Sequence, residues 1–305
     1  MSPRTVRPDR PDAATTPRAR FAGAAGAPYS DPVPAPTTTS RRGSRSQLAR
    51  QFRRASSVGA LVAVMVLGGQ PVAHAAPQGR PDPEPTGSAG HSGYALATLQ
   101  QDDGHSIALR WNPCRPITYR INTGGLPAKE RPAFAAQVRR ALTSLAAATG
   151  LTYRDLGSTS YVPRRADTSA PADLVIAATD QRHTDYPIGD RMVGYGGYQY
   201  WQWPDRDGRP AAAISRGWVV IDSATFRRLP AGFGPGVRQG NVLMHELAHT
   251  VGLEHVDDAR QLMNAELTAG SPNGWAAGDR RGLALLGPGG GGCITLPATV
   301  AGNRS

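Results

Sequence analysis

Long apolar segments are missing from this 305-residue chain. Its most apolar stretch, SVGALVAVMVLGG at residues 57–69, is well short of the roughly 20 residues that a membrane-spanning helix needs, and Pro71 follows it closely. No internal repeat is visible either. These absences argue against a stable membrane anchor and against a repeat architecture.

A positive charge spread over the whole chain is also missing, although the formal net charge is +11. Residues 1–75 contain eleven arginines and three acidic residues, which leaves 23 basic and 20 acidic residues downstream. This near-balance beyond residue 75 argues against a surface that binds nucleic acid through its phosphates. We therefore expect no nucleic-acid partner.

The arginine-rich N-terminal region has the pattern of an export signal. Residues 1–40 are rich in Pro, Ala, Arg and Thr without apolar periodicity, and we expect them to be disordered. Residues 41–75 combine a basic segment, the short apolar stretch and the small residues AHA, which predicts a signal peptide cleaved near Ala75. The alternative is a membrane anchor, which the short apolar stretch disfavours. We therefore expect the protein to be secreted and extracellular.

The chain beyond the signal consists of a linker and one domain. Residues 76–93 are rich in Pro, Gly and Ser and have no apolar pattern, as in a flexible linker. Residues 94–305 have the size of one compact domain.

Cysteine is scarce, with Cys114 near the start of the predicted domain and Cys293 near its end. An even pair in a secreted chain favours a disulfide, which would close a loop of about 180 residues and stabilise the fold by roughly 5 kcal/mol. Two alternatives stay open at this point: both thiols are free, or Cys114 occupies a metal site as a thiolate before activation.

Strand and helix patterns alternate after Cys114. PITYRIN at 116–122 alternates apolar and polar residues, which predicts a strand. Residues 131–150 have apolar residues at helical spacing and end on Gly150. Three further strand patterns lie at 151–156, 172–178 and 216–222. This order predicts a mixed α/β sheet with helices packed on it.

The segment HELAHTVGLEH at 245–255 contains three of the seven histidines in the chain. Apolar residues recur at four-residue intervals from Leu243, which gives a helix one apolar face. His245 and His249 are also four apart, so they lie about 40° apart around the axis and roughly 6 Å apart along it. Two imidazoles so placed can bind one metal ion, and Glu246 lies beside them as a base for a bound water.

Gly252 and His255 extend this pattern to a third ligand. A glycine accepts the left-handed conformation that ends a helix and lets the chain turn sharply. In a continued helix, His255 would lie about 240° around the axis from His249 and could not reach the same ion. The full pattern H-E-x-x-H-x-x-G-x-x-H has a chance probability on the order of 10⁻⁵ at this composition. The sequence therefore predicts one metal ion bound by His245, His249 and His255.

This pattern resembles the zinc signature of the metzincin metallopeptidases. In that family a methionine lies beneath the metal in a tight turn after the third histidine, and Met263 matches this place. The spacing is most similar to the matrixin branch. Weaker similarity extends over residues 111–287, where 172–197 is similar to the third strand, the following loop and the edge strand of a matrixin. The low lysine content is typical of a protein from a high-GC bacterium.

The resemblance implies an α/β (α+β) metzincin-like fold. Such a fold has a mixed, mostly parallel twisted sheet with an antiparallel edge strand, an active-site helix, and a short C-terminal subdomain with one helix. The upper part of the catalytic domain would cover about 94–252 and the lower part about 253–305.

Some residues depart from the animal matrixins. His183 and Asp185 resemble two ligands of their structural zinc, but no further histidine occurs before His245, so we expect a solvated loop there. Calcium could bind as well, but the sequence does not reveal where, and no cysteine-switch propeptide is recognisable. Val256 and Asn264 stand where the animal enzymes have Ser and Tyr. We expect one catalytic Zn²⁺.

The resemblance implies a secreted zinc-dependent endopeptidase. Glu246 would act as the general base toward a zinc-activated water and then protonate the leaving amine, and Met263 would pack beneath the site. The segment containing Val193, Gly194 and Tyr195 would pair with an extended protein or peptide substrate by β-augmentation, unless it is a purely structural strand. We expect the enzyme to be a monomer.

Two other functions fit the same residues. A secreted, non-catalytic zinc-binding or interaction protein could use the same fold, but Glu246 would then be dispensable. A zinc amidase could instead cleave cell-wall crosslinks, although no carbohydrate-binding or wall-binding segment is recognisable. The presence of Glu246 favours an enzyme.

Overall fold

The computed structural model describes residues 19–20, 93–100, 104–165, 167, 169–189 and 192–297. The predicted N-terminal extension, signal peptide and linker therefore lie outside the described residues, apart from Gly93 and the two-residue strand β1 (Ala19–Arg20). β1 pairs antiparallel with β11 (Glu266–Leu267). None of the helices in the described part of the chain has the length and apolar character needed to cross a bilayer.

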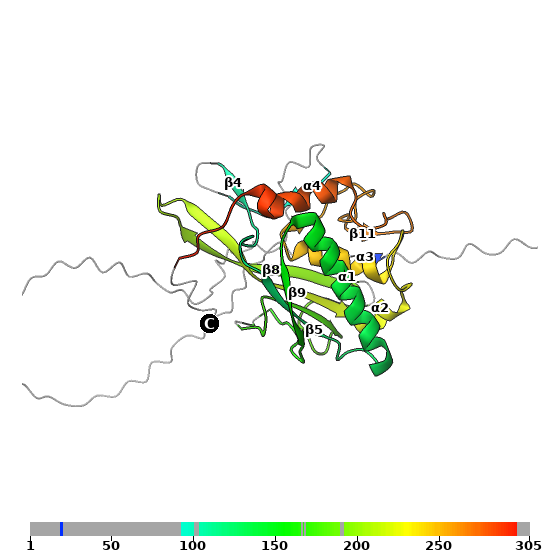
Figure 1. Cartoon of the computed structure of the whole chain (residues 1–305). Helices are drawn as coiled ribbons and strands as arrows, with labels where there is room; N and C mark the ends of the chain where they lie inside the picture. The colour runs from blue at the N-terminus through cyan, green and yellow to red at the C-terminus, as the bar shows by residue number, and fades with distance from the viewer. Residues whose placement is uncertain are drawn as a thin grey trace, which may run out of the picture.

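A five-stranded sheet forms the centre of the fold (Figure 1). In spatial order its strands are β6 (Tyr153–Ser158), β5 (Ile117–Asn122), β7 (Leu174–Thr179), β9 (Pro210–Asp222) and β8 (Gly194–Pro204). The first four are parallel neighbours, whereas β8 pairs antiparallel with β9 and forms one edge. The predicted mostly parallel sheet with an antiparallel edge strand is thus confirmed.

The largest difference from the predicted strands is at β9, which begins six residues earlier than 216. The added residues, 210–215, are mostly small and do not alternate in polarity. They form a strand because they pair with the second half of β8, in a hairpin that closes at Pro204 and Pro210. Pairing of this kind depends on the partner strand, so the local pattern of residues 210–215 does not reveal it.

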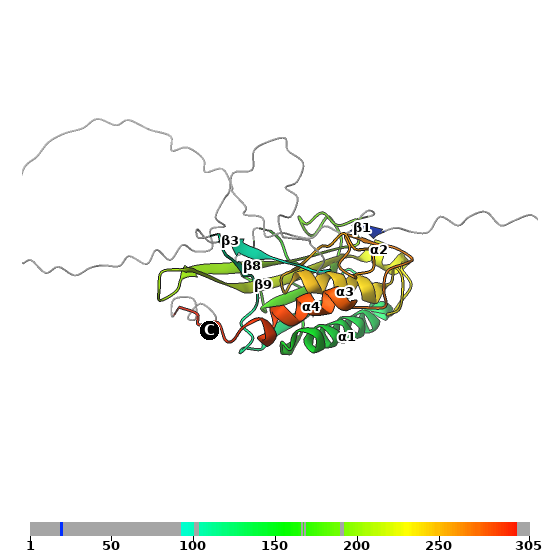
Figure 2. The ribbon, with the colours of Figure 1, turned by 90° about the horizontal axis from the view of Figure 1, so that it is seen from above.

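Helices α1 (Arg131–Thr149) and α3 (Gln239–His249) pack on one face of the sheet, and Figure 2 shows α4 (Ala277–Leu286) on the same side. α1 buries the apolar residues that predicted it, among them Phe134 and Leu145. It ends as predicted at Gly150, which has a φ of +75° and donates its N–H to the carbonyl of Ala146 at 2.8 Å.

A loop after β7 covers part of the opposite face. Tyr186 and Ile188 are buried against Val220 of β9. The ring of Tyr186 stacks on Tyr195, with ring centroids 5.0 Å apart, and on Trp218 at 5.5 Å. The sheet is therefore covered on both sides near the start of its edge strand.

The chain beyond α3 is a short C-terminal part. It contains β10 (Leu253–Glu254), β11, α4 and the 3-10 helix η2 (Pro288–Gly290). Two short helices elsewhere, η1 (Ala128–Glu130) and α2 (Ser223–Arg228), were not predicted from the sequence. Asp222 caps α2, because its side chain accepts the Thr225 N–H at 2.8 Å.

An N-terminal strap, defined as the described residues from 93 to 109, crosses this C-terminal part. It contains β2 (Ala95–Leu96), β3 (Thr98–Gln100) and β4 (Ser106–Ala108). β3 and β4 pair as an antiparallel hairpin, and β2 pairs antiparallel with β10. The strap therefore begins in the predicted upper part of the domain and pairs with the start of the predicted lower part.

A disulfide joins Cys114 to Cys293, with Cα atoms 5.3 Å apart. Hydrogen bonds accompany it on both sides: Arg110 donates to the Gly292 carbonyl at 3.0 Å, and the Asn112 amide donates to the Ile294 carbonyl at 2.8 Å. The alternatives of free thiols and of a Cys114 thiolate in a metal site do not apply to this structure. The bond fastens the end of the chain to the segment that precedes β5.

Replacing both cysteines with serine is expected to lower the free energy of unfolding by about 2–5 kcal/mol, because the unfolded chain regains the freedom that the crosslink removes. Urea unfolding of the wild type and the double variant measures this difference. A reductant should destabilise the wild type and leave the variant unaffected. A double variant as stable as the oxidised wild type would contradict the prediction.

Candidate metal centre

Helix α3 carries His245 and His249 one turn apart, and both are fully buried. The helix ends at His249, three residues before the predicted end at Gly252. Gly252 is where the chain turns into β10, with a φ of +98°. A Cβ at this position would also collide with the carbonyl oxygen of Leu109. Glycine is therefore required both by its conformation and by the close approach of the N-terminal strap.

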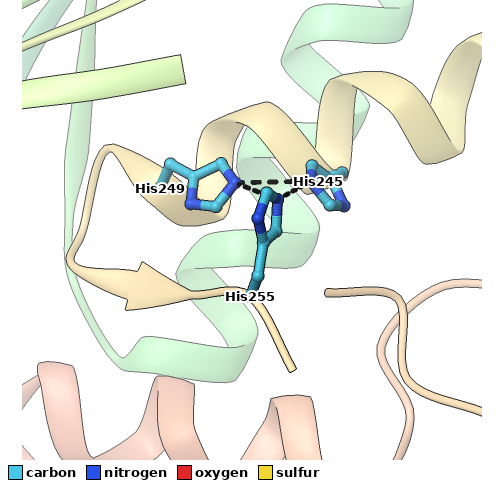
Figure 3. Close-up of side chains that lie close together, drawn as sticks. All are labelled: His245, His249 and His255. Carbon is cyan, nitrogen blue, oxygen red and sulfur yellow. Dashed lines mark hydrogen bonds between the residues drawn. The ribbon is translucent and has the colours of Figure 1, made fainter. Parts of the chain in front are cut away.

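The turn at Gly252 brings His255 back toward the helix, so that three imidazole rings face one another (Figure 3). The Nε2 atom of His255 lies 3.0 Å from that of His245 and 3.2 Å from that of His249. The third distance, between His245 and His249, is 3.3 Å. The predicted ligand set is thus brought together at one point.

Backbone carbonyls fix which nitrogens face the centre. His245 donates its Nδ1–H to Leu262 and His249 donates its Nδ1–H to Leu253, each at 2.8 Å. A neutral imidazole carries one proton, so Nε2 of both rings is left with a lone pair. Burial lowers the pKa of His245 to about 3 and that of His255 to about 4, and it holds the pKa of His249 well below its usual value. All three rings are therefore neutral at pH 7.

The lone pairs on Nε2 of His245 and His249 face each other across 3.3 Å, an arrangement that a cation between the rings would stabilise. Nitrogen ligands about 2.0–2.1 Å from a tetrahedral zinc ion lie roughly 3.3 Å apart, close to the spacing of the three Nε2 atoms. Within the described residues, this is the one group of three or more His, Cys, Asp or Glu whose ligand atoms lie within 4.8 Å of one another. The three neutral imidazoles, the carbonyl partners of His245 and His249, and the spacing of the Nε2 atoms fit a metal ion.

Glu246 is completely buried beside the edge strand. Within the described residues, neither of its carboxylate oxygens has a hydrogen-bond partner. Burial raises the pKa of Glu246 to about 8, and the nearby backbone N–H of Gly196, whose contact does not reach hydrogen-bond geometry, partly opposes this shift. A Cβ at Gly194 would lie 2.8 Å from Cγ of Glu246, and one at Gly196 would collide with the Glu246 carbonyl. The two glycines of β8 therefore allow α3 to approach the edge strand closely.

The three predicted edge residues differ in orientation. The carbonyl of Val193 accepts the Asp222 N–H at 2.8 Å, so Val193 faces β9. Backbone groups alternate in direction along an antiparallel pair, which turns those of Tyr195 toward β9 as well. The backbone N–H and C=O groups of Gly194 and Gly196 then point away from β9, toward the side of β8 that pairs with no other strand of the described sheet. Gly196 was missed in the sequence because its position relative to Glu246 depends on how β8 packs against α3.

Met263 is buried in a turn that is tied to the residue after His255. Its carbonyl accepts the Val256 N–H at 3.0 Å, and the side-chain amide of Asn264 donates to the Val256 carbonyl at 3.0 Å. Val256 and Asn264, the two departures from the animal matrixins, therefore bond to each other in this structure.

Asp279 of α4 supports the same turn and was not recognised in the sequence. Its buried carboxylate accepts the backbone N–H of Leu262 at 2.7 Å, that of Met263 at 3.3 Å and that of Ala276 at 2.8 Å. Leu262 in turn accepts the Nδ1–H of His245. An aspartate in the first turn of a helix is the signal that could have identified this cap.

Tyr198 and Glu254 form a further link that the sequence did not reveal. Burial raises the pKa of Glu254 to about 7, and its hydrogen bond with Tyr198 opposes this shift. Tyr198 belongs to β8, and Glu254 directly precedes His255. The bond therefore connects the edge strand to the segment that carries the third histidine.

His183 and Asp185 are exposed residues of the loop after β7. His183 pairs with Asp180 at 2.7 Å, and Asp185 accepts the Arg165 N–H at 2.9 Å. Neither belongs to a group of three candidate ligands among the described residues.

Comparison with known families identifies the domain. The Matrixin family model, Peptidase_M10, matches residues 110–284. A search of curated proteins returned no match to the chain. The matched segment covers more than half of the chain and contains the three histidines, Glu246 and Met263. The chain therefore belongs to the matrixin family of metallopeptidases.

Proposed function

We propose that this matrixin is a secreted, monomeric zinc endopeptidase with one catalytic site. The observation that carries the proposal is the convergence of three neutral imidazoles on one point, with their Nε2 atoms 3.0–3.3 Å apart. In this proposal His245, His249 and His255 hold the ion, and the turn at Met263, which bonds to Val256 and to Asp279 of α4, supports them.

A zinc ion held by these residues supplies a Lewis acid that lowers the pKa of water and polarises a carbonyl group. In its ionised form Glu246 accepts the proton of the attacking water, and its raised pKa suits it to donate that proton to the leaving amine. The absence of hydrogen-bond partners for the Glu246 carboxylate among the described residues leaves both oxygens available for this transfer. Its burial keeps bulk water from competing.

The edge strand β8 orients the substrate in this proposal. An extended peptide adds to the open edge by pairing with the outward backbone groups of Gly194 and Gly196. Because Gly194 lies against the Glu246 side chain, a peptide on this edge has its backbone beside the base. The site therefore recognises the peptide backbone, in agreement with an endopeptidase.

The purified protein is expected to contain one zinc ion and to cleave casein. A chelator should reduce cleavage to background, and zinc added in excess of the chelator should restore it, because ligand positions set by backbone hydrogen bonds can be refilled. Zinc content and release of casein fragments are measured on the same samples. A protein that holds zinc but cleaves no protein or peptide would support the non-catalytic alternative.

A further inference from the structure

The N-terminal strap lies against the segment that carries the third histidine. Residues 252–255 position two of the three histidine rings. His255 belongs to this segment, and the Leu253 carbonyl accepts the Nδ1–H of His249 at 2.8 Å. The family match begins at residue 110, so the strap lies outside the matched segment.

Backbone hydrogen bonds join the strap to this segment. β2 pairs antiparallel with β10, with Leu96 opposite Leu253. Ala97 donates its N–H to the Gly252 carbonyl at 2.9 Å, and its own carbonyl accepts the Leu109 N–H at 2.8 Å. The Leu109 carbonyl lies against the Cα of Gly252 so closely that a Cβ there would collide with it. The strap therefore contacts both the turn after α3 and the strand that leads to His255.

Helix α4 holds the strap from the other side. Gly278 and Gly282 are four residues apart and share one face of the helix. A Cβ at Gly278 would collide with the Gly93 carbonyl, and one at Gly282 would lie 2.5 Å from Cδ1 of Leu253 and 2.9 Å from Cβ of Tyr94. Because Gly278 and Gly282 have no side chains, the strap and β10 can both pack closely against this face of α4.

We infer that residues 93–97 of the strap are a positioning element for the metal site. A two-residue strand such as β10 has little stability without a partner, so its pairing with β2 fixes the backbone that directs His255 and His249 toward the ion. This inference rests on the proposed zinc site. Loss of partners that orient metal ligands typically lowers metal affinity about 10–100-fold. A maturation cut that preserves the enzyme must therefore fall before Gly93.

The test compares Ala97→Pro with Ala97→Val in the full-length protein. Both substitutions add two carbon atoms, but only proline removes the N–H that bonds to Gly252. Zinc affinity is measured by competition with a chromophoric chelator, and thermal unfolding is recorded with and without zinc. We expect Ala97→Pro to bind zinc about 10–100-fold more weakly, and Ala97→Val to bind it like the wild type.

A second pair of variants covers the case in which Ala97→Pro does not fold. Gly278→Ala should displace Gly93 from α4 and weaken zinc binding, whereas Leu285→Ala, on the exposed face of the same helix, should not. Wild-type zinc affinity in a folded Ala97→Pro variant, or in Gly278→Ala if the first is unfolded, would overturn the role of the strap and leave the proposed function intact. A wild-type protein that binds no zinc would contradict the proposed function itself.

Discussion

The Glu246→Gln variant is expected to keep its zinc and to lose about 10²–10⁴-fold in kcat/KM for a peptide substrate. Glutamine has the shape of glutamate but cannot accept a proton from water. Within the described residues, the carboxylate has no hydrogen-bond partner that the amide would break. Glutamine is uncharged at every pH, whereas Glu246 must bury a charge when it ionises, so the fold should be at least as stable.

Kinetics with a quenched fluorescent peptide and the zinc content of the same preparation test this expectation. Glu130→Gln is a matched control, since Glu130 is a surface residue that pairs with Arg227. It should retain wild-type kcat/KM. Wild-type activity in Glu246→Gln would show that another group acts as the base. An equal loss of kcat/KM in both variants would mean that the substitutions disturb the fold and that the loss does not report on a catalytic base.

The His255→Ala variant is expected to lose both zinc and activity. Two imidazoles on one helix turn would remain, and the affinity should fall by more than the roughly 10–100-fold caused by losing an outer partner of a ligand. His255 is the suitable ligand to remove, because it is partly buried and lies outside α3, so the core of the helix stays intact. The stabilisation that bound zinc gives to the folded state should disappear with it.

Zinc content after dialysis and the shift in Tm on adding zinc measure this loss. His183→Ala serves as the control, because His183 is exposed and pairs with Asp180 away from the three-histidine group. It should bind zinc as the wild type does. If His255→Ala retained one tightly bound zinc, the third ligand would have to be a different residue.

The sequence predicted those elements whose own residues determine their form. Alternation in PITYRIN placed β5, and the apolar spacing of α1 together with Gly150 placed both ends of that helix within a residue. The histidine pattern predicted three rings at one point because helical spacing and one glycine turn determine their geometry. These features depend on short stretches of chain.

The features that the sequence did not reveal depend on contacts between distant residues. β2 and β10 are two residues long and carry no periodic pattern, so only their pairing makes them strands. Gly278 and Gly282 suggest a weak helix when taken alone, yet their missing side chains admit the strap. Asp279 and Tyr198 contribute through partners that lie far away in the sequence.

The disulfide turns the region from Cys114 to Cys293 into a covalent ring. All three histidines, Glu246 and the edge strand lie inside this ring, so a single self-inflicted cut in one of its loops would release no fragment. On a denaturing gel, such a cleaved protein would migrate as one band without reductant and as two bands after the disulfide is reduced. Residues 93–109 precede the ring. If the chain is cut between residue 109 and Cys114, only non-covalent contacts hold these residues to the ring. A single cut between the strap and Cys114 would leave the strap without a covalent link to the ring, and its release would then weaken zinc binding as inferred above.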